Sequence, residues 1–440
     1  MVRGARQVGK SWLIEAFGRE AFDSLVKLDF ERDPGLASLF EARSPREVLA
    51  LLETQTRTAI RPGRTLLFLD EIQAAPAVLA RLRYFAEELP ALHVIAAGSL
   101  LDVALADHAF AMPVGRISYL HLEPMTFDEF LAADDSRGLA AYLAELDADT
   151  EIPALIHDQL LERLRTYLLV GGMPAAVEAW LATGSLLEVA RVQSDLLATF
   201  RDDFGKYRRR FPEDRLTKVF AALPRMVGRK FVAARIDHDD RAAPIKEAFR
   251  LLTLARVVTP VRRSACNGVP LGAEVDDAWF KVCLLDTGLY AAQLGIDASG
   301  LANTRELTLV HEGQLAEQFV GQELRAARPA HEEPALFCWI REQRTSNAEV
   351  DYVIAERQTV VPLEVKAGAT GRLRSLHAFV RDKRRHLAVR LWSGPPQLIA
   401  TTTALPDGPP WSFRLLSLPL YAAGQVRRLV AAAQADQGTT

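Results

Sequence analysis

Residues 4–11 read Gly4-Ala5-Arg6-Gln7-Val8-Gly9-Lys10-Ser11. They follow the pattern G-x-x-x-x-G-K-S, in which backbone amides wrap phosphate oxygens and glycine avoids a collision between a Cβ atom and the anion. We expect Lys10 to neutralise the β- and γ-phosphates of a nucleotide and Ser11 to ligate Mg²⁺. A helix that begins here would direct the positive end of its dipole towards the same anion. The segment is therefore predicted to be a phosphate-binding loop (P-loop).

A second segment supports this prediction. Residues 66–69 form a short apolar run, and Asp70 and Glu71 follow it directly. In a parallel sheet, the carboxyl end of a buried strand reaches the ligand crevice. We therefore expect Asp70 to hold Mg²⁺ through its water shell and Glu71 to orient the attacking water. The alternative is an ordinary strand that ends in a solvated acidic turn.

Two further polar residues are candidates for the same site. The next expected strand ends in Gly98-Ser99, so the Ser99 hydroxyl could sense the γ-phosphate or position water, or could simply cap a helix. Arg116 could stabilise the transferred charge from a neighbouring subunit of a homo-oligomer, or be an ordinary surface arginine.

Strand and helix patterns alternate over the first 130 residues. Buried strands are expected at 25–30, 65–69 and 92–97, and helices at 44–56 and 76–89. Such alternation predicts an α/β fold with a parallel sheet covered by helices. Only Met1, Val2 and Arg3 precede the P-loop, which normally follows a complete buried strand. We therefore expect the first strand to be truncated and translation to begin upstream.

Four segments are expected around and after this core. The P-loop core spans 1–135, a helical lid-like region spans 136–213, a winged-helix-like module spans 214–300, and a smaller α/β domain spans 301–425. The helical region should break at residues 171–174, and the module should contain a hairpin with its turn at 266–268. The α/β domain should have strands at 335–340, 349–354 and 360–365. Residues 426–440 are expected to be a frayed tail.

The α/β domain carries a group of charged residues. Glu364 and Lys366 share one face of an expected strand, because side chains alternate along it. Asp351 lies on the adjacent expected strand, and Glu317 lies on the preceding helix. Such a set can hold a divalent metal, with the lysine near an attacked phosphate. The alternative is a half-exposed sheet with solvated charges.

Composition limits the class of protein. A length of 440 residues suggests about two or three domains, and 49% hydrophobic with 25% charged residues is ordinary for globular protein. The net charge of -3 gives no general attraction to nucleic acid or to an anionic membrane. DNA contact would need local patches, such as the basic runs 206–210 and 383–386, although such runs are usually solvated helix faces.

The expected location is the cytoplasm. The three cysteines have no CxxC spacing, so neither a disulfide framework nor a zinc site is indicated. The longest apolar stretch, 168–187, is interrupted by glycine, proline and glutamate and would span a bilayer poorly. We expect no signal peptide and no membrane partner.

The motifs together resemble those of bacterial and archaeal AAA-like ATPases that carry a C-terminal domain of restriction-endonuclease-like fold. The resembling segments include GARQVGKS (4–11), LLFLDEIQAAP (66–76), AAGSLL (96–101), VGRI (114–117), GGMP (171–174), EGQLAEQFVGQEL (312–324), EVDYVI (349–354) and LEVK (363–366). The resemblance implies a Mg²⁺-dependent ATPase domain, a winged-helix-like linker and a nuclease-like domain.

The resemblance also implies residue roles. By this resemblance, Lys10 and Ser11 would bind phosphate and magnesium. Asp70 and Glu71 would be the metal-side and water-orienting carboxylates. Ser99 would be the sensor residue, and Arg116 would be the candidate arginine finger. The nuclease-like set would be Glu317, Asp351, Glu364 and Lys366. Three functions stay open: an ATP-driven switch or motor on nucleic acid or a protein partner, an ATP-regulated DNA nuclease, and a nucleotide-gated binding protein with an inactive nuclease-like domain.

Overall fold

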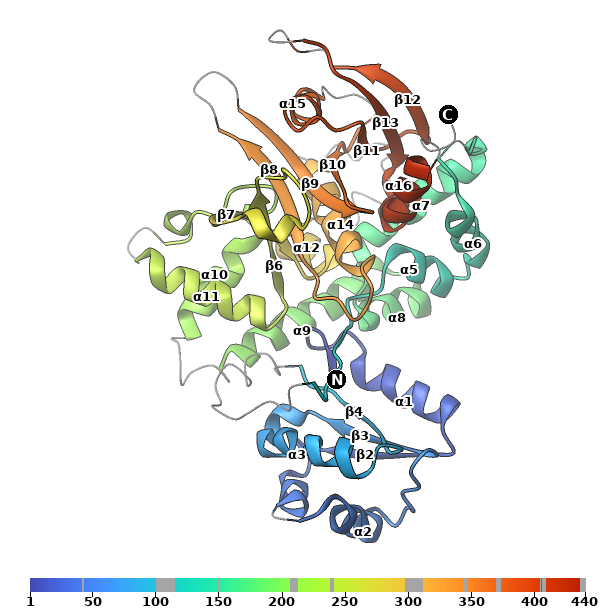
Figure 1. The fold of residues 1–440 in the computed structure, drawn as a ribbon, viewed down its shortest axis with the longest axis vertical. Coiled ribbons are helices and arrows are strands. Elements are labelled where there is room, and N and C mark those ends of the chain that lie inside the picture. Colours follow the sequence, from blue (N-terminus) through green and yellow to red (C-terminus); the bar gives the residue numbers. More distant parts are fainter. Residues whose placement is uncertain are drawn as a thin grey trace. The chain divides into compact units, whose positions relative to one another are not determined.

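The computed structural model describes residues 1–41, 43–99, 115–148, 150–205, 213–237, 241–296, 312–342, 347–368, 373–403, 405 and 409–435. These residues form two compact units (Figure 1). The first unit comprises Met1–Glu123, Leu254–Val257 and Pro329–Glu333, and the second unit comprises Pro124–Thr253, Val258–Arg328 and Pro334–Thr440. Within the described residues, no helix is both long enough and apolar enough to cross a membrane.

Parallel strands and helices build the first unit. Its strands are β1 (Val2–Arg3), β2 (Ser24–Asp29), β3 (Thr65–Asp70), β4 (His93–Ala96) and β5 (Leu120–His121). Its helices are α1 (Lys10–Ala21), α2 (Pro45–Thr56) and α3 (Pro76–Glu88), with the 3-10 helices η1 (Pro34–Phe40) and η2 (Ile72–Ala74). The expected parallel α/β arrangement is confirmed, because β3 pairs in parallel with both β2 and β4.

The central strand β3 is buried on both faces. Leu67 and Leu69 pack into the core formed with α2 and α3, whereas Leu66 and Phe68 belong to a second core with Ile14 of α1. Because successive side chains of a strand point to opposite faces, a strand covered on both sides must be apolar throughout. This requirement explains the uninterrupted apolar run that precedes the Asp-Glu pair.

The short strand β1 lies between β4 and β5. It pairs in parallel with β5, and Val2 forms a parallel bridge with Ala97, directly after β4. The strand order of the first unit is therefore β2-β3-β4-β1-β5 when the bridge is counted. Strand β1, which precedes the P-loop, comprises 2 residues. The ends of β1, β3 and β4 bring the P-loop, the acidic pair and Ser99 to one edge of the sheet.

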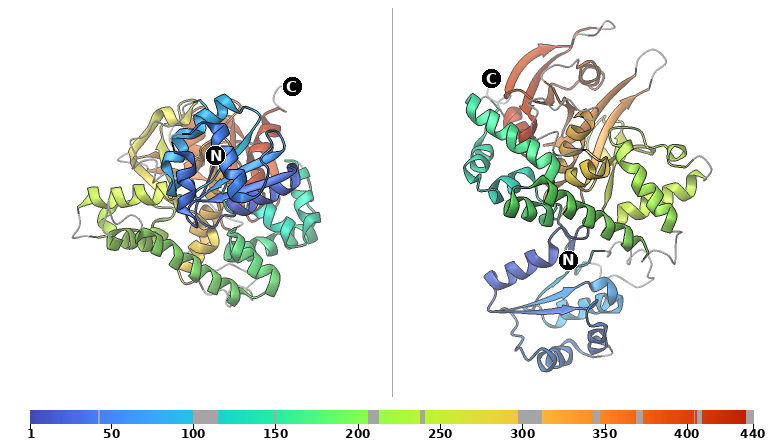
Figure 2. Two further views of the ribbon diagram at one scale, coloured as in Figure 1. Left: turned by 90° about the horizontal axis from the view of Figure 1, so that it is seen from below. Right: turned by 180° about the vertical axis from the view of Figure 1, so that it is seen from behind.

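Helices form much of the second unit. They are α5 (Phe127–Ala133), α6 (Arg137–Glu145), α7 (Ala154–Val170), α8 (Pro174–Thr183), α9 (Leu186–Phe204), α10 (Glu213–Ala222), α11 (Ala242–Leu254, ending in the first unit), α12 (Thr287–Gln293), α14 (Glu312–Ala326), α15 (Arg374–Asp382) and α16 (Val426–Ala435). Helices α7, α8 and α9 pack side by side (Figure 2). The expected break at 171–174 separates α7 from α8, where Gly171 has a positive φ of 75°.

One eight-stranded sheet completes the second unit, in the order β12-β13-β11-β10-β9-β8-β6-β7. Its strands are β6 (Val258–Ser264), β7 (Val275–Leu284), β8 (Leu336–Arg341), β9 (Ala348–Glu356), β10 (Thr359–Val365), β11 (Leu387–Trp392), β12 (Gln397–Thr402) and β13 (Ser412–Pro419). The β6–β7 hairpin joins this sheet through a parallel pairing of β6 with β8. The hairpin expected in the winged-helix-like module thus shares a sheet with the later strands, and the four segment boundaries stay predictions.

The frayed tail expected over 426–440 is wrong for residues 426–435, which form α16. The buried side chains of α16 are Val426, Leu429, Val430 and Ala433. Their spacing of three, four and seven residues is one face of a helix, and this face packs into the unit. The alanine-rich composition of this segment made its helical periodicity hard to recognise in the sequence. The last five residues lie outside the described part of the chain.

Candidate phosphate site and carboxylate cluster

The P-loop requires glycine at two positions. Gly9 has a φ of 93°, a left-handed conformation that disfavours other residues, and helix α1 begins immediately after it. A Cβ atom at Gly4 would lie 2.5 Å from the backbone oxygen of Leu122. The backbone directly after β5 therefore closes one side of the loop. Both glycines of the motif are explained by this local geometry.

Lys10 folds back over the loop. Its Nζ donates hydrogen bonds to the carbonyl oxygens of Gly4, at 3.1 Å, and Ala5, at 2.7 Å, and the residue is only 7% exposed. Burial lowers the pKa of Lys10 to about 8, although the carboxylates of Glu71 and Asp70 oppose the shift. A buried ammonium that donates to carbonyl oxygens is a suitable partner for an incoming anion.

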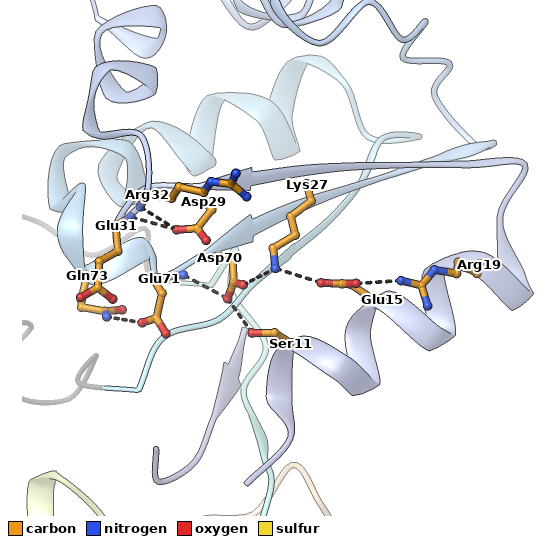
Figure 3. Close-up of polar contacts among 10 residues, drawn as sticks. All are labelled: Ser11, Glu15, Arg19, Lys27, Asp29, Glu31, Arg32, Asp70, Glu71 and Gln73. Atoms are coloured by element: carbon orange, nitrogen blue, oxygen red, sulfur yellow. Dashed lines mark hydrogen bonds and ion pairs between the residues drawn. The ribbon is translucent and has the colours of Figure 1, made fainter. Parts of the chain in front are cut away.

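Asp70 receives hydrogen bonds from both sides (Figure 3). Its Oδ1 accepts from the Ser11 hydroxyl at 3.0 Å and from the Glu71 amide at 3.1 Å. The hydroxyl and the carboxylate come from segments that are 59 residues apart. The structure thus brings together the two oxygen donors that were predicted to hold Mg²⁺.

Lys27 of β2 completes this group, and the sequence analysis missed it. Its Nζ lies 2.9 Å from Asp70 Oδ2 and 2.9 Å from Glu15 Oε1 (Figure 3). Burial opposes the charge, but hydrogen bonds to Asp70 and Glu15 outweigh it and raise the pKa of Lys27. In the parallel register Lys27 pairs with Phe68, two residues before Asp70. That register was the signal that could have identified it.

Glu71 has an unusual backbone and two side-chain neighbours. Its φ is 48°, and its Oε2 accepts a hydrogen bond from the Gln73 amide and a long one, at 3.5 Å, from the Ser99 hydroxyl. Gly98 lies against Gln73, because a Cβ atom there would be 2.0 Å from Gln73 Oε1. The segments that follow β3 and β4 therefore pack together around Glu71, and Ser99 takes part in this contact. The role of Ser99 as a sensor stays a prediction.

The charged residues of the second unit also come together. Lys366 Nζ lies 2.7 Å from Glu364 Oε1, and Asp351 Oδ2 accepts from the Val365 amide at 2.8 Å. Burial raises the pKa of Glu364, and Asp351 adds to that increase. Strand β10 is buried along nearly its whole length, so the half-exposed sheet with solvated charges is not what forms here.

The carboxylate cluster contains a lysine that the sequence analysis missed. Lys281 of β7 lies 2.5 Å from Glu317, 3.0 Å from Glu349 and 3.9 Å from Asp351. Burial by itself would lower the pKa of Lys281, but the carboxylates of Glu317, Asp351 and Glu349 outweigh it and raise this pKa well above its usual value. Lys281 lies in a segment with the residue pattern of a strand and belongs to no sequence motif. Its position beside α14 is therefore apparent only from the pairing of the strands.

The basic run 383–386 contacts the turn of the β6–β7 hairpin. Lys383 donates to the Asn267 side chain at 2.7 Å, and Arg385 donates to the Asn267 carbonyl at 2.6 Å. This run therefore holds the turn of the β6–β7 hairpin. Residues 206–210 lie outside the described residues.

Residues 1–131 match the AAA domain family. We refer to residues 1–131 as the AAA domain, after the family that they match. Residues 161–300 and 312–393 match two families described as domains of unknown function, DUF8612 and DUF4143. Among solved structures, the chain is similar to the ORC2 protein of Aeropyrum pernix in its ADPNP-ADP complexes, with 13% identity over 69% of this chain and 88% of that chain and a TM-score of 0.33. No curated protein matches the chain.

Within the AAA domain, Arg116 is set apart from the other predicted site residues. Its guanidinium lies 3.7 Å from Glu87 at the end of α3, and its side chain is 51% exposed. Arg83 of α3 also forms an ion pair with Glu87, at 2.9 Å. An exposed arginine of this kind is available to a second copy of the chain, so its role in trans stays a prediction.

Proposed function

We propose that the AAA domain binds ATP and hydrolyses it with Mg²⁺. The observation that carries the proposal is the hydrogen bond between the Ser11 hydroxyl and Asp70, with the buried Lys10 ammonium on the same loop. An alcohol, a carboxylate and an ammonium on a glycine-bounded loop are the donor set that a magnesium nucleotide requires.

Each residue has a proposed task. Residues 4–9 would wrap the phosphate chain, Lys10 would neutralise its terminal phosphates, and Ser11 with Asp70 would hold the metal. Mg²⁺, when bound, neutralises the phosphate oxygens. Glu71 would orient the attacking water, with Gln73 and Ser99 fixing its carboxylate, and Arg116 would act on the site of a neighbouring copy.

The experiment is calorimetry with Mg·ATP combined with a phosphate-release assay on the purified chain. Lys10→Ala is expected to lose both binding and hydrolysis. Glu71→Gln is expected to keep binding and to lose hydrolysis by about 100-fold, as removal of a general base does. Lys218→Ala, at an exposed lysine of the second unit paired with Asp237, serves as the matched control. Wild-type turnover in Lys10→Ala would refute the proposal.

We also propose that ATP turnover acts on a nucleic acid or a protein partner through the second unit. The net charge of -3 and the engagement of run 383–386 in the hairpin turn favour a protein partner. The test is the hydrolysis rate with duplex and single-stranded DNA at several salt concentrations. Strong stimulation that weakens with salt would point to DNA instead.

A further inference from the structure

Lys281 is a fully buried ionisable residue of the second unit. Its side chain is 0% exposed, and the nearest carboxylate oxygens belong to Glu317, Glu349 and Asp351 at 2.5, 3.0 and 3.9 Å. An ammonium group cannot be buried alone without a large desolvation penalty. The burial of Lys281 therefore depends on these three carboxylates.

Two carboxylate oxygens of this cluster accept hydrogen bonds from neighbouring groups. One carboxylate oxygen of Asp351 accepts from the Val365 amide, and one of Glu364 accepts from Lys366. The other oxygen of Glu364 is buried and has no hydrogen-bond partner among the described residues. A single oxygen of this kind does not make a divalent-metal site, because Mg²⁺ and Ca²⁺ need about six or more oxygen ligands.

The arrangement does not suit a metal ion in other respects. No group of three or more histidine, cysteine, aspartate or glutamate side chains in the described part of the chain is placed to hold one. A divalent ion between Glu317 and Asp351 would also lie against the ammonium of Lys281, and like charges at such distances repel strongly in a buried place. The geometry and the charge of this cluster both disfavour the divalent metal that its acidic residues and the Glu364–Lys366 pair suggest in the sequence.

We propose that the ammonium of Lys281 takes the place of a divalent cation among Glu317, Glu349 and Asp351, so that this cluster is a metal-independent ion-pair core and not a nuclease centre. The second unit then keeps its strands and α14 together through this core. The function of the second unit is then to bind a partner or to transmit a signal, and it does not cleave DNA. This inference concerns the second unit alone and does not depend on ATP hydrolysis by the AAA domain.

The test is Mn²⁺ titration by calorimetry on the full chain without nucleotide. All proteins carry Asp70→Asn, so that the proposed magnesium site of the AAA domain does not contribute. With Lys281 present, we expect no Mn²⁺ binding that depends on Asp351. Lys281→Met, of similar length and without charge, is expected to gain a Mn²⁺ site that the further change Asp351→Asn removes.

Two results would overturn the proposal. One is Mn²⁺ binding, or Mn²⁺-dependent DNA nicking, by the protein with Lys281 intact that Asp351→Asn abolishes. The other is a Lys281→Met protein as stable to urea as its parent, since carboxylates left without their cation should destabilise the unit. If Lys281→Met fails to fold, that result supports the proposal that the unit requires this ion-pair core. The Mn²⁺ titration with Lys281 intact then still decides whether the cluster binds a metal.

Discussion

Asp70 is shared between a hydroxyl, an amide and an ammonium group. The hydroxyl of Ser11 and the amide of Glu71 meet at Oδ1, which leaves Oδ2 to Lys27 at 2.9 Å. An ammonium and a magnesium ion beside one carboxylate repel each other. Lys27 is therefore expected to set how much Mg²⁺ the AAA domain needs.

Lys27→Met should lower the Mg²⁺ concentration that gives half-maximal ATP hydrolysis. A partly exposed ion pair contributes about 1 kcal/mol, which corresponds to a change of roughly fivefold. The measurement is a Mg²⁺ titration of hydrolysis at saturating ATP, with Lys27→Arg as the control that keeps the charge. An unchanged or increased Mg²⁺ requirement in Lys27→Met would show that the ion pair has no such role.

Gln73 is expected to act as a positioning residue for Glu71. Gln73→Ala should lower kcat by about 10- to 100-fold and leave the KM for ATP unchanged, because misplacement of a catalytic group affects the chemical step. Gly98→Ala should have the same effect, since its Cβ atom would displace the Gln73 side chain. Gly138→Ala, where a Cβ atom meets nothing within 4 Å, is the control. Normal kcat in Gln73→Ala would contradict this role.

At the scale of the element, α14 is a buried helix that carries polar side chains. Gln318 bonds both the amide and the carbonyl of Leu284, at 2.8 and 2.9 Å, and Gln322 accepts from the Thr287 amide at 2.8 Å. Arg325 donates to the carbonyl oxygens of Leu284 and Leu285 at the end of β7. Buried backbone groups outside a ladder need such partners. The segment 312–324 therefore encodes a helix that fixes the chain between β7 and α12.

Gln318→Leu should destabilise the second unit, because the buried Leu284 amide loses the acceptor that Gln318 supplies, whereas the Leu284 carbonyl keeps its hydrogen bond from Arg325. Each unsatisfied buried group costs about 1–3 kcal/mol. The measurement is the urea midpoint followed by tryptophan fluorescence, and Gln397→Leu on the exposed edge strand β12 is the control. A midpoint in Gln318→Leu equal to that of the control would mean that water replaces the side chain.

At the scale of the whole molecule, buried acids make stability depend on pH. Burial raises the pKa of Glu323 from 4.5 to about 8, and Asp128 adds to this increase. The pKa values of Glu317 and Glu364 are also raised, in each case mainly by burial. Between pH 4.5 and about 8, the folded chain therefore holds more protons at Glu323 than the unfolded chain does.

The free energy of unfolding is accordingly expected to fall as pH rises through this window and to level off above about pH 8. Glu323→Gln should flatten the dependence, since a neutral amide can still accept from the Phe127 amide that Glu323 binds at 3.1 Å. The measurement is the free energy of unfolding by urea at about pH 5, 6, 7 and 8 for both proteins. Equal slopes for the two proteins would exclude Glu323 as a source.

The sequence by itself determined the parts of the protein that depend on neighbouring residues. Glycine spacing in residues 4–11 encodes a loop conformation, and the apolar run before Asp70 encodes a strand buried on both faces. Both are local properties of the backbone and of side-chain alternation. The positions of Lys10, Ser11, Asp70 and Glu71 could therefore be predicted.

Only the tertiary structure decided which charges meet. Lys27 reaches Asp70 through the register of β2 with β3, and Lys281 reaches Glu317 because β7 lies beside α14. Neither lysine belongs to a motif, since strand pairing joins residues that are far apart in the chain and leaves no local pattern at either position. For this reason the sequence indicated a metal site in the second unit, whereas the folded chain places its own cation there.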